Sequence, residues 1–136
     1  MFFTAVIHGR RPVLANDLAH ELLRGLWERS AAANGWFVGD YMLMPNHVHL
    51  FACPDADADD MAAWVKMWKS VSARRLIREC RVEAPVWQEE YFDRFLRTTE
   101  SYEQKWEYVR NNPVRAGLVS TADAWPYKGS IFDLRV

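Results

Sequence analysis

The order of extended and helical segments constrains the fold of this chain more than any other feature of its sequence. Four segments are rich in aromatic and β-branched residues, and three have apolar residues at helical spacing. The expected strands are residues 2–7, 36–44, 47–53 and 86–97, and the expected helices are residues 17–34, 61–81 and 101–112. The first six segments follow the order of a split β-α-β fold. We therefore expect an α+β, ferredoxin-like sandwich, an antiparallel sheet with helices, plus a C-terminal helix.

Turn and cap signals mark the borders of these segments. Asn16 or Asp17 can cap the first helix, and Gly35 can end it. Pro45-Asn46 separates the two central strands, which indicates a hairpin, and Pro113 stops the last helix. Beyond Gly117 we expect a loop that packs on the body of the protein.

Size and composition favour one domain, residues 1–136, with a single core. Half of the residues are hydrophobic, but no apolar run is long enough to span a bilayer. Cys53 and Cys80 fit no metal or disulfide spacing, so we expect a protein of the reducing cytoplasm. Because the net charge is -1, composition alone does not indicate a nucleic-acid partner.

Positive charge is concentrated in the second predicted helix, where six basic residues stand against the single acid Glu79. The apolar residues of this helix share one stripe, so most of the basic ones fall on the other side. Such a face can follow a phosphate backbone, but it is also typical of a solvated helix surface. The candidate DNA contacts are Lys66, Lys69, Arg74, Arg78 and Arg81.

Two histidines stand one residue apart in the second central strand. The two-residue period of a strand sends His47 and His49 to the same face, while Val48 and Leu50 point the other way. The spacing therefore creates two neighbouring nitrogen ligands on a strand that is anchored in a core. A His-x-His pair by itself is more often two ordinary strand histidines, and imidazole favours zinc, copper or nickel over magnesium.

The last predicted helix carries a tyrosine that is not on its core stripe. Tyr102, Trp106 and Val109 share one side, and Tyr108 lies roughly 120° from its centre. Asn112 follows Tyr108 at i+4, so the two polar groups share a side of the helix. A simpler interpretation is a tyrosine that covers a neighbouring strand with its hydroxyl in water.

Together these motifs resemble the REP-associated tyrosine transposases, a group within the HUH single-tyrosine transposases of bacterial insertion sequences. Several ordered motifs at such spacing are more specific than either the histidine pair or the tyrosine alone. The matching stretches are residues 10–14, 44–49, 69–75, 87–88, 93–94 and 108–119.

The resemblance implies a role for each matching residue. His47 and His49 match the metal-binding histidines of the family, and Asn112 matches the position of a third metal ligand. Tyr108 matches the nucleophile. The pair Asp93-Arg94 matches a recurrent pair near the fourth strand, to which we assign only a supporting role.

The resemblance also implies an activity, which is that of an HUH transposase-like catalytic domain. Tyr108 would nick single-stranded or hairpin DNA with Mg²⁺ or Mn²⁺ as cofactor, leaving a 5′-phosphotyrosine and a free 3′-hydroxyl. Strand transfer would reverse this step without ATP. The resemblance suggests a homodimer and no membrane partner. Two alternatives remain, a hairpin-binding protein without catalysis and a metal phosphodiesterase that uses the histidines without Tyr108.

Overall fold

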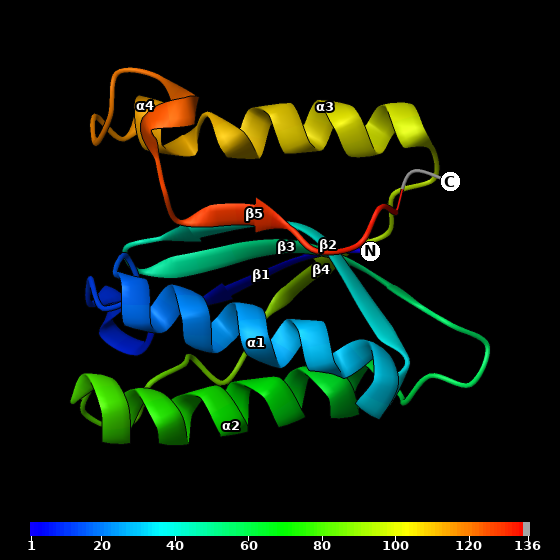
Figure 1. The fold of residues 1–136 in the computed structure, drawn as a ribbon, viewed down its shortest axis with the longest axis horizontal. Helices are drawn as coiled ribbons and strands as arrows, with labels where there is room; N and C mark the ends of the chain where they lie inside the picture. Colours follow the sequence, from blue (N-terminus) through cyan, green and yellow to red (C-terminus); the bar gives the residue numbers. More distant parts are fainter. Residues whose placement is uncertain (135–136) are drawn as a thin grey trace.

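The computed structural model describes residues 1–134, in which a five-stranded sheet lies between two layers of helices (Figure 1). Helices α1 (Asp17–Asn34) and α2 (Met61–Cys80) cover one face, and α3 (Thr99–Arg110) covers the other. The strands are β1 (Phe2–Val6), β2 (Trp36–Met44), β3 (His47–Pro54), β4 (Phe92–Arg94) and β5 (Lys128–Ser130). Short helical turns are η1 (His8–Arg10), α4 (Asn112–Arg115) and η2 (Ala122–Ala124).

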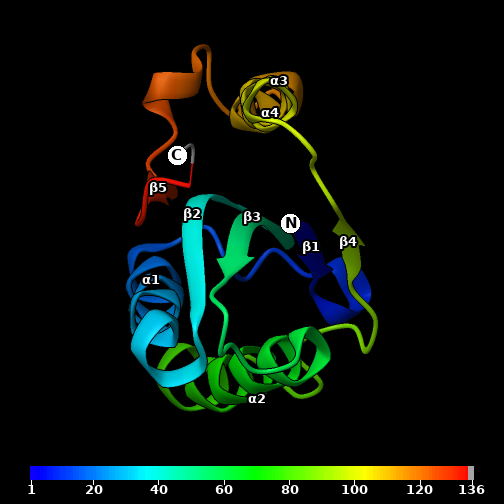
Figure 2. The same cartoon turned by 90° about the vertical axis from the view of Figure 1, so that its right-hand side faces the viewer.

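The strand order β4-β1-β3-β2-β5 is antiparallel throughout, with β4 and β5 at opposite edges (Figure 2). Strands β4 to β2 in this order, with α1 and α2 on one face, form the predicted ferredoxin-like arrangement, which is confirmed. Residues 135 and 136, which the single-domain prediction includes, lie outside the described residues. No helix within residues 1–134 is long and apolar enough to cross a membrane.

The larger core lies between the sheet and the α1–α2 layer. Val48 and Leu50 of β3 point into it, as the strand period predicts, and are fully buried. Trp64 and Trp68 of α2 are also buried there, and the Trp64 ring stacks on Trp36 with ring centroids 4.7 Å apart. Both tryptophans belong to the apolar stripe predicted for this helix, and their aromatic contacts fix how α2 lies on the sheet.

A smaller core joins the opposite face of the sheet to α3. Phe51 of β3 packs against Tyr102, whose hydroxyl also donates a 2.8 Å hydrogen bond to the buried Asp40 carboxylate. The backbone N–H of Asp40 donates to the same hydroxyl at 3.1 Å. Tyr102 and Val109 are buried and Tyr108 is exposed, so the predicted core stripe of this helix is confirmed.

Three predicted elements differ from the structure. In the 86–97 segment only Phe92–Arg94 pairs as a strand, because Lys69 Nζ draws the carbonyls of residues 88–90 toward α2. The loop predicted after Gly117 contains β5, which pairs with β2. Gly129 permits this pairing, since a Cβ there would lie 2.7 Å from the Tyr41 hydroxyl. The last helix, predicted over residues 101–112, is Thr99–Arg110 in the structure.

The buried Tyr102–Asp40 contact predicts the stability of the α3 layer. Tyr102→Phe keeps the ring but removes the hydroxyl that satisfies two polar groups of Asp40, so the free energy of unfolding should fall by about 1–3 kcal/mol. Urea unfolding measures this loss. Tyr91→Phe is the matched control, because no hydrogen bond to its hydroxyl occurs within residues 1–134, and it should change stability by less than about 0.5 kcal/mol.

Candidate active site

The two histidines lie on the face of β3 that α3 covers. His47 and His49 are half-buried, and their ring centroids are 4.8 Å apart at an angle of 82°. Strand register puts His49 beside Thr4 of β1 and Met42 of β2. The alternate positions of β3 are packed in the larger core, so the strand holds both imidazoles at fixed places beneath α3.

Hydrogen bonds at the Nδ1 atoms indicate which nitrogen of each ring carries the proton. The Asn46 Oδ1 atom lies 2.7 Å from His47 Nδ1, and an amide oxygen only accepts, so this Nδ1–H donates. The Thr4 hydroxyl lies 2.8 Å from His49 Nδ1, while an Asn112 N–H points to His49 Nε2. Both rings therefore keep an Nε2 lone pair on the side away from these anchors, as metal-binding histidines do.

Both imidazoles are neutral near pH 7. Burial lowers the pKa of His49, the neighbouring His47, Lys105 and Arg115 act in the same direction, and together they bring it to about 3. Burial also lowers the pKa of His47, with a smaller contribution from Arg10. A neutral imidazole is the form that binds a metal, so the site needs no deprotonation before binding.

Asn112 connects the histidines to the segment that carries Tyr108. Its Nδ2 lies 3.2 Å from His49 Nε2, and its Oδ1 accepts a 2.7 Å hydrogen bond from Arg115 Nη2. To act as a metal ligand, the amide must turn so that its oxygen faces His49, which exchanges the Arg115 hydrogen bond for a metal bond. A break at Asn111, with φ −90° and ψ 0°, makes Asn112 the first residue of α4.

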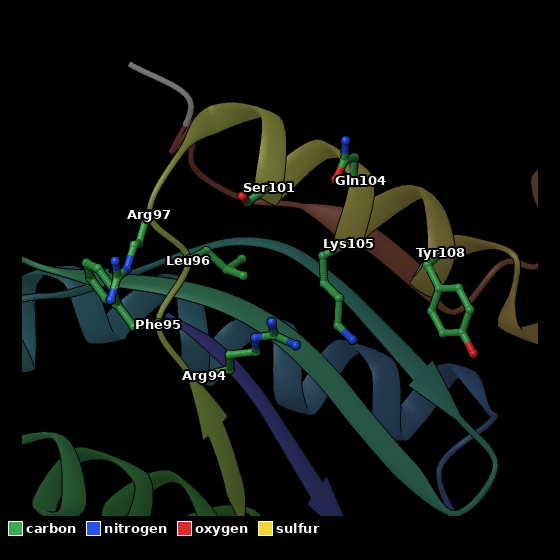
Figure 3. A pocket seen from close by; sticks show the side chains of 8 residues that line it. All are labelled: Arg94, Phe95, Leu96, Arg97, Ser101, Gln104, Lys105 and Tyr108. Atoms are coloured by element: carbon green, nitrogen blue, oxygen red, sulfur yellow. The ribbon is translucent and has the colours of Figure 1, made fainter.

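Tyr108 projects from α3 toward the sheet side of the helix and is 60% exposed (Figure 3). Arg115 lies against its ring, with Cζ 3.8 Å from the ring centroid, and the Lys105 ammonium lies 5.6 Å from it. Lys105 is also 4.8 Å from the ring of Phe2, which stacks on His49. Two chains of contacts thus connect Tyr108 to His49. One passes through Arg115 and Asn112, and the other passes through Lys105 and Phe2.

The basic side of α2 is not part of this cluster, because α2 lies on the opposite face of the sheet (Figure 1). Lys69 Nζ is bound to three carbonyls, and burial lowers its pKa. Arg75 and Arg78 both contact Glu79. Lys66 and Arg74 are exposed. The predicted DNA-binding role of this face stays a prediction, at a distance from the histidines.

Sequence reasoning did not find four residues that shape the site. Thr4 and Asn46 anchor the imidazoles, and Lys105 and Arg115 surround Tyr108. Arg115 belongs to the stretch that resembles the transposases, so the resemblance could have indicated it. Thr4 follows only from the pairing register of β1 and β3, which no local pattern specifies.

The donor set suits a divalent metal that takes most of its ligands from elsewhere. Within residues 1–134 no group of three or more His, Cys, Asp or Glu side chains could hold an ion. The available donors are two imidazole nitrogens and the Asn112 oxygen, all neutral. Oxygen ligands from outside the chain would have to complete the coordination shell of an ion held by these three donors.

Comparison with known proteins identifies the class. Residues 2–112 match the family described as "Transposase IS200 like". The chain therefore belongs to the IS200-like transposases, a family that acts on DNA.

Individual relatives narrow this class. A REP-associated tyrosine transposase of Escherichia coli K12 is 26% identical over 131 residues, covering 93% of this chain and 73% of that protein. A protein of Haemophilus influenzae, provisionally given the same name, is 24% identical over 143 residues, covering 98% of this chain and 81% of its own length. The resemblance read from the sequence is confirmed.

A solved structure shares the fold. The structure of a REP-associated tyrosine transposase bound to a REP hairpin matches with a TM-score of 0.74 at 21% identity. The match covers 98% of this chain and 87% of that chain. The five-stranded sheet and its helices are therefore those of this structural class.

The buried imidazole of His49 predicts how stability depends on pH. Between pH 6.5 and about 3 the unfolded chain binds a proton at His49 that the folded chain does not, so the free energy of unfolding decreases as the pH falls. From pH 7 to pH 5 this contribution is about 2 kcal/mol. Urea unfolding with a chelator present measures it. In His49→Gln the free energy of unfolding should fall by about 2 kcal/mol less between pH 7 and pH 5 than in wild type. His8→Gln, at an exposed position, should behave as wild type.

Proposed function

We propose that this transposase-family chain nicks single-stranded or hairpin DNA and transfers the cut strand, with Tyr108 as nucleophile and a divalent metal at His47, His49 and Asn112. The observation that carries the proposal is the continuous set of contacts from His49 through Asn112 and Arg115 to Tyr108. These contacts connect two neutral imidazoles, an amide and the exposed phenol of Tyr108. None of these features is needed for a purely structural role.

The bond changes of the proposed step are simple. The Tyr108 oxygen bonds to phosphorus as the bond between phosphorus and the 3′ oxygen breaks. The phenolic proton passes to a base or to water, and the departing oxygen takes up a proton to become a 3′-hydroxyl. DNA remains attached to Tyr108 through its 5′-phosphate, and a new 3′-hydroxyl can reverse the step with no external energy source.

The surrounding residues have defined tasks in this step. A divalent metal, when bound, would polarise a nonbridging oxygen of the scissile phosphate. Thr4 and Asn46 keep the Nε2 atoms of the histidines free of protons. Lys105 and Arg115 supply positive charge next to the tyrosine ring, where negative charge accumulates on the phosphate during attack.

The proposed substrate follows from the family and from the exposure of the nucleophile. The structural relative is a transposase bound to a REP hairpin, and the same class of substrate, a hairpin with unpaired flanks, is proposed here. Tyr108 lies on the surface, 60% exposed, so an extended strand could reach it. In a rigid duplex, by contrast, one backbone would have to approach Tyr108 while the rest of the duplex lay against the sheet.

Removal of the Tyr108 hydroxyl tests the nucleophile. Tyr108→Phe keeps the ring between Arg115 and Lys105, so DNA binding should stay close to wild type, while the covalent adduct should fall by at least about 10³-fold. Denaturing electrophoresis of a labelled hairpin incubated with protein and Mn²⁺ measures the adduct.

The matched control is Tyr91→Phe, on the side of the sheet that α2 covers, which should form the adduct as wild type does. An adduct that persists in Tyr108→Phe would assign the nucleophile to another residue. No adduct from any variant, together with intact hairpin binding, would favour a DNA-binding protein without catalysis.

The histidines have their own test. His47→Ala, His49→Ala should lose Mn²⁺ binding in calorimetry performed with hairpin DNA, and its adduct formation should fall by about 10²-fold or more. His20→Ala, on α1, provides the histidine control and should bind Mn²⁺ normally. Wild-type cleavage by the double variant would show that the metal, if required, binds elsewhere.

A further inference from the structure

A hollow of about 420 Å³ extends from Tyr108 along α3 to the segment that follows β4 (Figure 3). Arg94, Phe95 and Arg97 line it from the β4 side, and Lys105 and Tyr108 line it from α3. One end is therefore the proposed nucleophile, and the other is the edge of the sheet. We refer to these five residues as the β4–α3 groove.

The groove has three cations, Arg94, Arg97 and Lys105. None of the residues that line the hollow within residues 1–134 is acidic. The ion pairs within residues 1–134 include neither Arg94, Arg97 nor Lys105. Arg94 and Lys105 extend toward each other from β4 and α3 (Figure 3), an arrangement of like charges that an anion between them would relieve. A phosphate group has the charge to fill this role between Arg94 and Lys105.

Exposed aromatic rings stand beside these cations. Phe92 is 66% exposed and Phe95 is 67% exposed, in a chain that buries most of its large apolar side chains. In the sheet Phe92 pairs with Thr4 and Arg94 pairs with Phe2. Paired residues of antiparallel strands share a face, so Phe92 and Arg94 lie on the histidine face.

The same register gives the distance between Phe92 and the histidines. Phe92 stands two strands from His49, with Thr4 between them, which is roughly 10 Å across the sheet. The aromatic and basic edge thus belongs to the same surface as the histidines and Tyr108.

We infer that the β4–α3 groove and the exposed Phe92 of β4 bind the unpaired DNA strand next to the phosphate that Tyr108 attacks, with bases stacked on Phe92 and Phe95 and phosphates held at Arg94, Arg97 and Lys105. Alternating cations and exposed rings are the features of sequence-tolerant single-strand sites. This inference rests on the proposed function for its location at Tyr108, and it adds the path of the substrate.

The groove favours a single strand over duplex DNA. A base can stack on Phe92 or Phe95 only if it is unpaired and unstacked from its neighbours. The bases of a paired stem are not. The cations stand on two sides of one hollow, Arg94 on β4 and Lys105 on α3, so a single backbone between them would contact both sides. The stem of a hairpin would consequently bind at another surface, and the groove would take its flank.

The test is fluorescence anisotropy of a labelled oligo-dT strand of about 16 nucleotides, at several salt concentrations, with the full chain. Phe95→Ala should weaken binding by roughly 5- to 150-fold, and Phe95→Trp should restore it because it keeps a stacking surface. Arg94→Ala, Arg97→Ala should reduce the salt slope of log affinity by about 1.4, that is about 0.7 for each lost phosphate contact. All of these positions are exposed, so the fold should be retained.

The matched control is Arg29→Ala, which removes an exposed cation from α1 on the other side of the sheet. It should leave the affinity for oligo-dT within about twofold. The rival DNA surface is the basic side of α2, and a loss in Lys66→Ala, Arg74→Ala that equals or exceeds the loss in the Arg94→Ala, Arg97→Ala variant would overturn the groove in favour of α2. The groove would also be overturned if the Phe95→Ala and Arg94→Ala, Arg97→Ala variants bound oligo-dT with the affinity of wild type. The same holds if the wild-type protein did not bind oligo-dT at low salt.

The adduct assay separates this inference from the proposed function. If the groove variants lose the strand and no form of the protein makes an adduct, the groove is supported and nicking by Tyr108 is wrong. If wild type makes the Tyr108 adduct and the groove variants bind oligo-dT normally, nicking is supported and the groove is wrong.

Discussion

The two-residue period of β3 is the constraint on which the rest of the structure depends. Its inward residues, Val48 and Leu50, are fully buried against the α1–α2 layer, so the strand cannot slip by one residue without exposing them. The same register fixes His47, His49 and Phe51 on the other face. Phe51 receives Tyr102 of α3, and the histidines receive Asn112 of α4. One strand therefore positions both the imidazoles and the helix layer above them.

Local patterns were sufficient to predict the elements with large apolar stripes, and insufficient for those fixed by tertiary contacts. Helix α1 begins after the Asn16 cap and ends at Gly35, which has a left-handed φ of 73°, as its sequence indicates. Strand β5 has the sequence Lys-Gly-Ser, which carries no strand signal, and it exists because Gly129 fits against Tyr41. The end of α3 was misplaced for a similar reason, since Asn111 leaves the helix before Pro113 can stop it.

The candidate site shows the same division. His47, His49, Tyr108 and Asn112 were found because the resemblance covers residues that are close in sequence within two short stretches. The residues that prepare them come from other strands or from an unremarkable helix position. Thr4 reaches His49 only through the β1–β3 register, and Lys105 reaches Phe2, whose ring stacks on His49, only because α3 lies over β1. Sequence spacing contains neither relation.

The near-neutral charge of the chain is a poor guide to its interaction with DNA, because charge acts over short distances in salt. At physiological ionic strength interactions between exposed charges are screened beyond about 8 Å, so a phosphate responds to the side chains next to it. Four of the 18 acidic residues lie at residues 55–60, beside the C-terminal end of α1, where Asp59 accepts a hydrogen bond from Asn34. Within residues 1–134, the ion pairs include neither Lys105 nor Arg115, and both lie against the Tyr108 ring. A chain of net charge -1 can therefore present a strongly attractive surface to a phosphate at one place, and the structure puts that place at the proposed nucleophile.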